Sequence, residues 1–264
     1  MRLELQFLGS GNSRASALGN ASAVLLEEGR PLLGIDYGWT APEAWARQWG
    51  GPPPALYLTH AHLDHCGGLE ALFYERILGR MADPSLPLIP IYCPVALVPI
   101  LHQRLASYPS PLAEGGANFW DAFQLIPVGE RFWLGGRLFV SPAVRHHQPG
   151  TAYGLALPGV FLYSGDTRPI PEVLSLWAAG SEPVFHDASL RGNPSHTGLE
   201  DLEREYSPEQ RGRMVLYHLG GEEDCQAAEA AGYRVARPGD VFTLPTMTQF
   251  TGAASGGQPL PLRD

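Results

Sequence analysis

The chain has 264 residues, of which 44% are hydrophobic and 17% charged, so it can bury the core of one large or two small globular domains. Its net charge of −9 argues against a protein whose main task is to neutralise a nucleic-acid backbone. The 18 basic residues are all arginine, which excludes a P-loop lysine and a lysine Schiff base.

The N-terminal part predicts three strands, a helix and a further strand. The strands fall at 2–8, 22–28 and 31–36, the helix at 41–49, and the last strand at 55–59 after three prolines. The alternating apolar residues at the start favour a strand over a signal peptide. No apolar run approaches the roughly 18–20 residues that span a bilayer, so no membrane segment is expected.

The middle of the chain predicts helices and an irregular segment. Residues 69–80 and 95–106 predict helices, with a strand at 88–93 between them. The stretch 107–124 is rich in proline, glycine and aromatic residues, and it predicts a surface loop or a lid.

Hairpins and then alternating helices and strands follow in the second half. Glycine-containing turns predict hairpins over 131–144 and 152–164, and helices alternate with strands from 170 to 237. These patterns predict an α/β fold of layered sheets flanked by helices, with one domain over 1–245. The tail, 246–264, is rich in glycine, serine, threonine and proline and predicts an extended segment.

The most specific chemical signal is HAHLDH at 60–65, directly after a predicted strand. Alternate residues at a strand end point the same way, so His60 and His62 are expected to face one point. Asp64 and His65 follow where the chain turns into a helix, and two glycines then let the backbone bend close to whatever is bound. Imidazole with carboxylate favours zinc, manganese or iron over calcium, so the loop predicts a site for two adjacent divalent metals.

Further ligand candidates follow later strands. His146 and His147 end one apolar run, Asp166 ends another, and His218 ends a third. Each alone has a plain structural explanation, such as a turn aspartate or a buried hydrogen-bonded histidine. Their joint occurrence after β-rich runs makes a shared ligand set the stronger interpretation.

These motifs, HAHLDH at 60–65, a strand-end histidine near 147, SGDT at 164–167 and the late His218, resemble the ordered signature of the metallo-β-lactamase-fold hydrolases. The resemblance spans most of the chain and implies a four-layer αβ/βα sandwich with two metals at one edge, between the sheets. The ligand set it implies is His60, His62 and His147 on one metal, Asp64, His65 and His218 on the other, and Asp166 as the bridge.

The third position of the first metal has two candidates in neighbouring residues. His146 competes with His147, and we favour His147 because of its distance before the strand that contains Tyr153 and Gly154.

The chemistry expected of such a site follows from its two cations. Zinc is expected first, with manganese or iron as alternatives, and two such ions hold a bridging water and lower its pKa toward neutrality. The bridging hydroxide is then the expected nucleophile. Asp64 is both a ligand and a candidate catalytic proton acceptor.

Three further stretches resemble the ribonuclease Z branch of these hydrolases: FLGSGN at 7–12, HDAS at 186–189 and NPSHTG at 193–198. In that branch an acidic residue orients a histidine that assists the leaving group, which implies these catalytic roles for Asp187 and His196. Asp187 stands where the branch has glutamate. An ordinary turn aspartate and a surface histidine are the alternative explanations.

The substrate is expected to be small. Only the 18 residues of 148–165 separate His147 from Asp166, too few for the long tRNA-gripping arm that the ribonuclease Z branch inserts there. With the acidic net charge, this favours a phosphodiesterase acting on a small or cyclic phosphodiester over a tRNA 3′-end endonuclease, and long nucleic acid is not an expected partner. Arg168 is a candidate to bind a substrate phosphate, or to cap a surface turn.

Two other classes of function stay open. Hydrolysis of a thioester, lactone or lactam would use the same two metals without the pair formed by Asp187 and His196. A non-hydrolytic member of the fold would bind metal only.

Location and assembly rest on weaker signals. The three cysteines form no CxxC pair, so a disulfide scaffold is not expected and a cytoplasmic location fits best. Homodimers are common in the ribonuclease Z branch, and the resemblance therefore implies a homodimer as one assembly.

Overall fold

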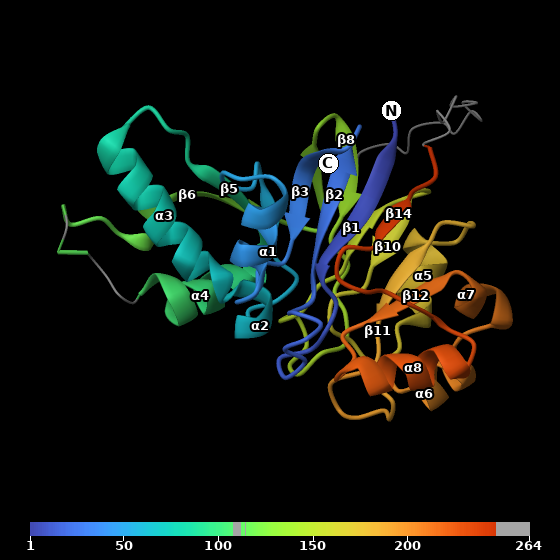
Figure 1. Ribbon diagram of the computed structural model, residues 1–264. Coiled ribbons are helices and arrows are strands. Elements are labelled where there is room, and N and C mark those ends of the chain that lie inside the picture. Colours follow the sequence, from blue (N-terminus) through green and yellow to red (C-terminus); the bar gives the residue numbers. More distant parts are fainter. Residues whose placement is uncertain (108–111, 114, 247–264) are drawn as a thin grey trace, which may run out of the picture.

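Two seven-stranded sheets lie face to face in the computed structural model, which describes residues 1–107, 112–113 and 115–246 (Figure 1). The first sheet consists, in spatial order, of β14 (Val241–Thr243), β1 (Leu3–Gly9), β2 (Ser22–Glu27), β3 (Arg30–Ile35), β4 (Leu56–Tyr57), β5 (Ile89–Pro94) and β6 (Phe123–Val128). Strands β14 to β3 pair antiparallel, whereas β3 to β6 pair parallel.

The second sheet has the same mixed character. Its strands, in spatial order, are β13 (Arg234–Val235), β12 (Met214–Tyr217), β11 (Val184–Asp187), β10 (Phe161–Tyr163), β9 (Leu155–Leu157), β8 (Arg137–Val140) and β7 (Arg131–Leu134). The strands from β10 to β13 pair parallel, and those from β7 to β10 pair antiparallel.

Helices lie outside the two sheets (Figure 1). The helices on the side of the first sheet are α1 (Ala41–Gln48), α2 (Leu63–Cys66), α3 (Gly68–Ala82) and α4 (Val98–Leu101). Those on the side of the second sheet are α5 (Pro171–Trp177), α6 (Leu199–Glu205), α7 (Pro208–Gly212) and α8 (Glu222–Ala230). This arrangement confirms the predicted four-layer αβ/βα sandwich.

Apolar side chains form one core between the sheets and one beneath each layer of helices. Leu3, Leu5 and Phe7 alternate along β1, and all three are buried in the core between the sheets. The ring of Phe7 lies against the rings of Tyr163 and Tyr217, with centroids 6.3 and 5.7 Å away. Since these tyrosines are the last residues of β10 and β12, the packing fixes the strand ends that carry candidate ligands.

Parallel strands of both sheets bring polar residues to one edge of the sandwich. Asp36 follows β3, Asp166 follows β10, Asp187 ends β11 and His218 follows β12. The carboxyl ends of neighbouring parallel strands lie at the same edge, so residues far apart in the sequence meet there.

Two predicted elements are correct in position but differ in kind or extent. The strand predicted at 55–59 is confined to β4, because the Thr59 amide donates a hydrogen bond to the Asp36 carboxylate at 2.8 Å and not to a neighbouring strand. The helix predicted at 95–106 is a 3₁₀ turn, then α4, and then a π-helical turn, η2 (His102–Ala106).

The prediction of a loop over 107–124 is wrong in its last part. A 3₁₀ turn, η3 (Phe119–Asp121), and the start of β6 fall there, and Phe119 is buried. Residues 108–111 and 114 lie outside the described part of the chain, and so does all of the predicted tail from 247. Within the described residues, no helix combines the length and apolar character needed to cross a membrane.

Candidate metal centre

The HAHLDH motif forms a tight connection between β4 and α2. His62 has an extended backbone (φ −73°, ψ 148°) at the start of α2, and Asp64 lies in the first turn of this helix. His60 and His65 are buried, with 2% and 0% of their surface exposed, whereas His62 is half-buried. The sequence therefore places three imidazoles and a carboxylate around one short helical turn.

Three overlapping groups of side chains meet at this connection. Within each group one potential ligand atom per residue lies within 4.8 Å of the others, a spacing at which each group could hold a metal ion. The groups are His60, His62, His146 and Asp166; Asp64, His65 and His218; and Asp166, His196 and His218.

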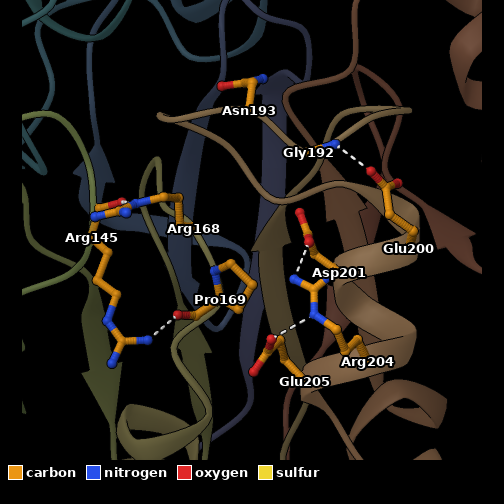
Figure 2. Close-up of a pocket in the computed structure, with 9 residues that line it drawn as sticks. All are labelled: Arg145, Arg168, Pro169, Gly192, Asn193, Glu200, Asp201, Arg204 and Glu205. Carbon is orange, nitrogen blue, oxygen red and sulfur yellow. Dashed lines mark hydrogen bonds and ion pairs between the residues drawn. The ribbon is translucent and has the colours of Figure 1, made fainter.

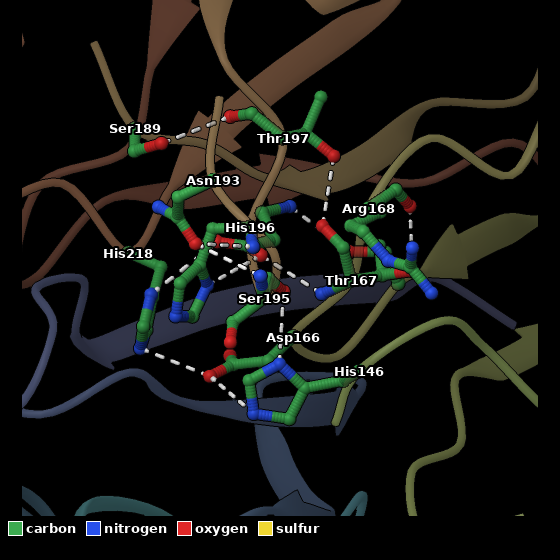
Figure 3. Close-up of polar contacts among 12 residues, drawn as sticks. His146, Asp166, Thr167, Arg168, Ser189, Asn193, Ser195, His196, Thr197 and His218 are labelled. Carbon is green, nitrogen blue, oxygen red and sulfur yellow. Dashed lines mark hydrogen bonds and ion pairs between the residues drawn. The ribbon is translucent and has the colours of Figure 1, made fainter. Parts of the chain in front are cut away.

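Asp166 lies between the first two of these groups. Its Oδ2 atom is 3.6 Å from Nε2 of His60 and 3.3 Å from Nε2 of His218, and its Oδ1 atom is 3.3 Å from Nε2 of His65. Figure 3 shows His146 and His218 turned toward this carboxylate. One buried carboxylate thus faces imidazoles from both groups.

Buried oxygens fix the orientation of His60 and His65. The Asp36 carboxylate accepts a hydrogen bond from Nδ1 of His65 at 2.8 Å and another from the Thr59 hydroxyl at 2.7 Å. Because this hydroxyl donates to Asp36, its oxygen is left to accept from Nδ1 of His60, 3.0 Å away. Both imidazoles therefore turn Nε2 inward, as metal-binding histidines do when a second residue holds Nδ1.

His146 and His218 are held in the same manner. Nδ1 of His146 donates to the backbone oxygen of Ser195 at 2.9 Å, and Nδ1 of His218 lies 3.3 Å from the Asp187 carboxylate. Their Nε2 atoms are thereby directed toward Asp166, at 3.9 and 3.3 Å.

The geometry favours His146 over His147, in contrast to the preference drawn from the sequence. His146 is 3% exposed and belongs to the first group, whereas His147 is exposed and belongs to none of the three. Nδ1 of His147 has only a long contact, 3.4 Å, with the hydroxyl of Ser195. The distance along the sequence to a later strand cannot distinguish two neighbouring histidines. The left-handed backbone at His147 (φ 48°) does distinguish them.

The polar atoms at the centre fit divalent cations. Among the described residues, buried atoms without a hydrogen-bond partner include Nε2 of His65, Nε2 of His218 and Oδ1 of Asp166. Buried polar atoms are rarely left unpaired in proteins unless an ion, water or ligand satisfies them. Imidazole nitrogens with carboxylate oxygens form a donor set that suits zinc, manganese or iron.

The charges at the centre are divided between its two sides. Burial holds the pKa of His60 well below its usual range and lowers the pKa of His62 to about 4. Burial also lowers the pKa of His218, but Asp166 and two further carboxylates outweigh it and raise this pKa to about 10. Burial raises the pKa of Asp166, yet the histidines around it hold that pKa well below its usual range. Without metal, protons on one side of the centre therefore balance the buried carboxylate.

His196 lies at the same centre through its bond with Asp187. Nδ1 of His196 donates to the Asp187 carboxylate at 2.9 Å, and the ring of His196 stacks on that of His218 with centroids 4.9 Å apart. Burial lowers the pKa of His196, but the hydrogen bond with Asp187 and the charge of that residue raise it overall. The structure thus brings together the pair that the sequence proposed for acid catalysis.

Thr167 connects the loops that carry these residues (Figure 3). Its amide donates to Asp187 at 2.8 Å, and its hydroxyl accepts from the Arg145 amide at 3.0 Å. Its backbone oxygen accepts from the Thr197 hydroxyl at 2.8 Å. The loops that present Asp166, His146 and His196 are therefore cross-linked through one buried threonine.

The two glycines after the motif allow close packing against the loop after β3. A Cβ atom at Gly67 would lie 2.2 Å from Nε1 of Trp39, and one at Gly68 would lie 2.4 Å from the Gly38 oxygen. These glycines let α2 and α3 sit directly on the loop after β3, which carries Asp36.

Two cavities flank the centre, and His62 lines both. The α4-side cavity, of about 350 Å³, is lined by the histidines of the first group together with Ile100, Arg104, His147, Gln148 and Thr151. The α8-side cavity, of about 340 Å³, is lined by Asp64, Asp166 and His218 together with Arg14, His196 and Asp224.

One known protein family matches nearly all of the residues that form this fold. A model of the family described as anti-Pycsar protein Apyc1 matches residues 3–242. This chain belongs to the Apyc1 family.

Relatives named anti-Pycsar protein Apyc1 come from bacteria and phages. The protein from Saccharibacillus brassicae is 33% identical, with 76% of this chain and 83% of that protein covered. The protein from Paenibacillus sp. (strain J14) is 30% identical, with 92% of this chain and 100% of that protein covered. The protein from Bacillus phage 010DV004 is 28% identical, with 92% and 98% covered.

Solved structures confirm the fold of this Apyc1-family chain. The metallo-β-lactamase-fold protein YhfI from Bacillus subtilis gives a TM-score of 0.71 at 14% identity, covering 92% of this chain and 100% of that one. A diphosphatase from the PhnP family gives 0.70 at 20% identity, covering 91% and 97%. A long-form RNase Z from yeast gives 0.57 at 14% identity, covering 92% and 42%. The resemblance to the metallo-β-lactamase fold and its ribonuclease Z-like members is therefore confirmed.

Arg168 does not line either cavity beside the centre. It lines a third cavity, of about 550 Å³, across from Asp201 and Arg204 (Figure 2). Its backbone amide donates to the Arg145 oxygen at 2.9 Å, and its Nε lies 3.4 Å from the same oxygen. This position makes Arg168 a link between the loops of His146 and Asp166.

Asp36 is the residue at this Apyc1-family site that sequence reasoning missed. It is fully buried, has a left-handed backbone (φ 60°) and holds both Thr59 and His65. The available signal was an aspartate directly after an apolar strand, the same signal that identified Asp166.

Proposed function

We propose that this Apyc1-family chain is a two-metal phosphodiesterase that hydrolyses a small cyclic nucleotide. The Apyc1 family degrades cyclic nucleotides. The observation that carries the proposal is the hydrogen-bonded pair of His196 and Asp187, 2.9 Å apart, beside Asp166 and His218. Breaking a phosphodiester requires an acid for the departing alkoxide, and this pair supplies one.

The proposed ligands are divided between two ions. His60, His62 and His146 would hold one, and Asp64, His65 and His218 the other, with Asp166 between them. When bound, two divalent cations, zinc first by donor chemistry, lower the pKa of a water molecule and bring positive charge to the phosphoryl oxygens.

The residues around the metals supply the proton transfers. Asp187 holds Nδ1 of His196, so the transferable proton of the imidazolium sits on Nε2. Burial lowers the pKa of His196, but its hydrogen bond with Asp187 raises this pKa overall, which favours the protonated form that can supply a proton to the leaving ester oxygen. Burial raises the pKa of Asp64, but His218 and His65 lower it overall, so Asp64 is a carboxylate that can accept a proton.

Cavity size and charge support a small substrate over a nucleic acid. The two cavities beside the centre, of about 350 and 340 Å³, are of the size that binds small molecules, roughly 300–1,000 Å³. A net charge of −9 opposes the binding of a long phosphate backbone.

The proposal is tested by assaying purified protein, stripped of metal and then reloaded with zinc or manganese, on a panel of 3′,5′-cyclic nucleotides. Turnover that requires metal and yields a nucleoside monophosphate supports the proposal. Hydrolysis of a thioester, lactone or β-lactam in preference to every cyclic nucleotide would overturn it, and so would cleavage of precursor tRNA in preference to them. Bound metal without any hydrolysis would indicate a non-hydrolytic member of the fold.

A further inference from the structure

The two cavities beside the metal centre differ in charge. The α8-side cavity is lined by three carboxylates, those of Asp64, Asp166 and Asp224, together with Arg14, His196 and His218. The α4-side cavity has no carboxylate among its lining residues in the described part of the chain, and its cation is Arg104. A guanidinium with no carboxylate among the other lining residues favours acceptor-rich parts of a substrate in the α4-side cavity.

Arg104 lines this cavity from an irregular helical turn. Arg104 lies in the π-helical turn η2, between α4 and the buried residues Leu105 and Ala106. Nε1 of Trp120 donates to Nδ1 of His102 at 3.1 Å and joins this turn to η3. Single π-helical turns occur often at functional sites because they redirect side chains.

Arg104 is exposed and lines the α4-side cavity. No hydrogen bond or ion pair joins its guanidinium to another residue within 1–107, 112–113 and 115–246. An arginine that lines a cavity beside a candidate metal centre has donors free for a ligand.

Gln148 faces the same cavity from another loop. Its backbone oxygen accepts hydrogen bonds from the Thr151 hydroxyl at 2.7 Å and from the Thr151 amide at 3.3 Å. This closes a turn with Gly150 in the left-handed region (φ 79°). The turn is thus fixed by its backbone, and the amide side chain of Gln148 is left to contact a ligand.

The other lining groups suit a flat, partly apolar ring. Ile100 offers an apolar side chain and His147 an exposed imidazole, which is not needed as a metal ligand when His146 takes that place. A nucleobase combines an apolar face with ring nitrogens and carbonyl oxygens at its edge. A cavity with an apolar side chain, an imidazole, an amide and a guanidinium matches these features.

We propose that the α4-side cavity is the nucleobase subsite, in which Arg104 and Gln148 bind acceptor atoms at the edge of the base. The inference rests on the proposed function, because the phosphate must lie at the metal centre for the base to reach this cavity. The proposal also assigns a role to Arg104. It gives the exposed His147 a place beside the base, next to the buried candidate ligand His146.

The experiment compares a cyclic nucleotide with an analogue that carries hydrogen in place of the base. For each, kcat/KM is measured with the metal-loaded wild type, with Arg104→Gln, and with Arg30→Gln as the matched control. Arg30 is an exposed arginine at the start of β3, the end of the strand opposite Asp36.

The wild type is expected to prefer the nucleotide over the base-free analogue. Arg104→Gln should lower this preference by about tenfold or more, the effect of losing a charged hydrogen bond, and leave the base-free analogue unchanged. Arg30→Gln should match the wild type on both. If Arg104→Gln lowers both substrates equally, or neither, the subsite proposal is overturned while the proposed function stands.

A binding measurement decides the inference independently of catalysis. A nucleoside, which has a base but no phosphate, is titrated into metal-free wild-type protein and into Arg104→Gln while amide resonances are followed by NMR. Shifts at residues 100–104 and 148–151 with a nucleoside but not with ribose, weakened in the variant, support the subsite. The absence of such shifts with all four nucleosides would contradict it, whatever the enzyme hydrolyses.

Discussion

Nδ1 of His146 donates a hydrogen bond to the backbone oxygen of Ser195, 2.9 Å away. This bond joins a candidate metal ligand to the loop that carries His196, the proposed acid. It also fixes which nitrogen of His146 faces the centre, because a carbonyl oxygen can only accept. The metal site and the acid are therefore positioned by one another.

Replacement of His146 should remove a metal ligand, whereas replacement of His147 should not. We expect His146→Ala to lower the affinity for one of the two metals by at least about 100-fold. This loss exceeds what is typical when a residue that only supports a ligand is removed. His147→Ala should keep the metal content of the wild type. Metal analysis after dialysis against graded chelator measures both, and the reverse pattern would restore the assignment made from the sequence.

Asp36 should control metal affinity although its side chain is not in any of the three ligand groups. Oδ1 of Asp36 accepts from the Thr59 amide, and Oδ2 accepts from the Thr59 hydroxyl and from Nδ1 of His65. In Asp36→Asn an amide nitrogen would replace one of these oxygens, and it cannot accept the hydrogens that it then faces. Loss of such a supporting group lowers metal affinity by about 10- to 100-fold. Competition with a chromogenic chelator measures this change. Asp83→Asn, an exposed aspartate that accepts hydrogen bonds from Ser85, is the matched control and should have no effect.

Metal binding should release protons at about pH 8, one of them from His218. Burial lowers the pKa of His218, but Asp166 and its neighbours raise it to about 10, so His218 carries a proton in the metal-free chain. A metal ligand must be neutral imidazole, and binding displaces this proton. His62, with a pKa of about 4, is already neutral and contributes none. Calorimetry in two buffers of different ionisation enthalpy should show the release, and the contribution of His218 should fade as the pH approaches 10. Heats independent of the buffer would refute it.

The importance of His196 should depend on the leaving group. His196→Ala should lower kcat for an alkoxide-releasing cyclic nucleotide by about 10²- to 10⁴-fold, because no acid then protonates the leaving oxygen. An ester that releases p-nitrophenolate needs little protonation and should lose far less. Metal content should stay at the wild-type level. Equal losses on both substrates would assign His196 to the metal site instead.

The sequence was sufficient for the motif at 60–65 because its geometry is local. One strand end and one helical turn position His60, His62, Asp64 and His65. The spacing of these residues in the sequence therefore predicts their arrangement. The later ligand candidates were identified as residues at strand ends, and the fold brings Asp166 and His218 to the same edge as the motif.

Other features of the site depend on contacts between distant segments. His146 is favoured over His147 by its hydrogen bond to the backbone oxygen of Ser195, 49 residues later in the chain. No local sequence pattern predicts this contact. Arg168 is only two residues from Asp166 in the sequence, but it lines another cavity, across from Asp201 and Arg204. Arg104 lines the α4-side cavity from a π-helical turn, whereas the sequence predicted a regular helix there.

The most direct test of the whole account is a titration of metal-free protein with zinc while the hydrolysis of a cyclic nucleotide is followed. The account predicts that activity saturates at about two equivalents of metal per chain, as two-metal catalysis requires. Full activity at about one equivalent, or no hydrolysis of any cyclic nucleotide at saturation, would contradict it.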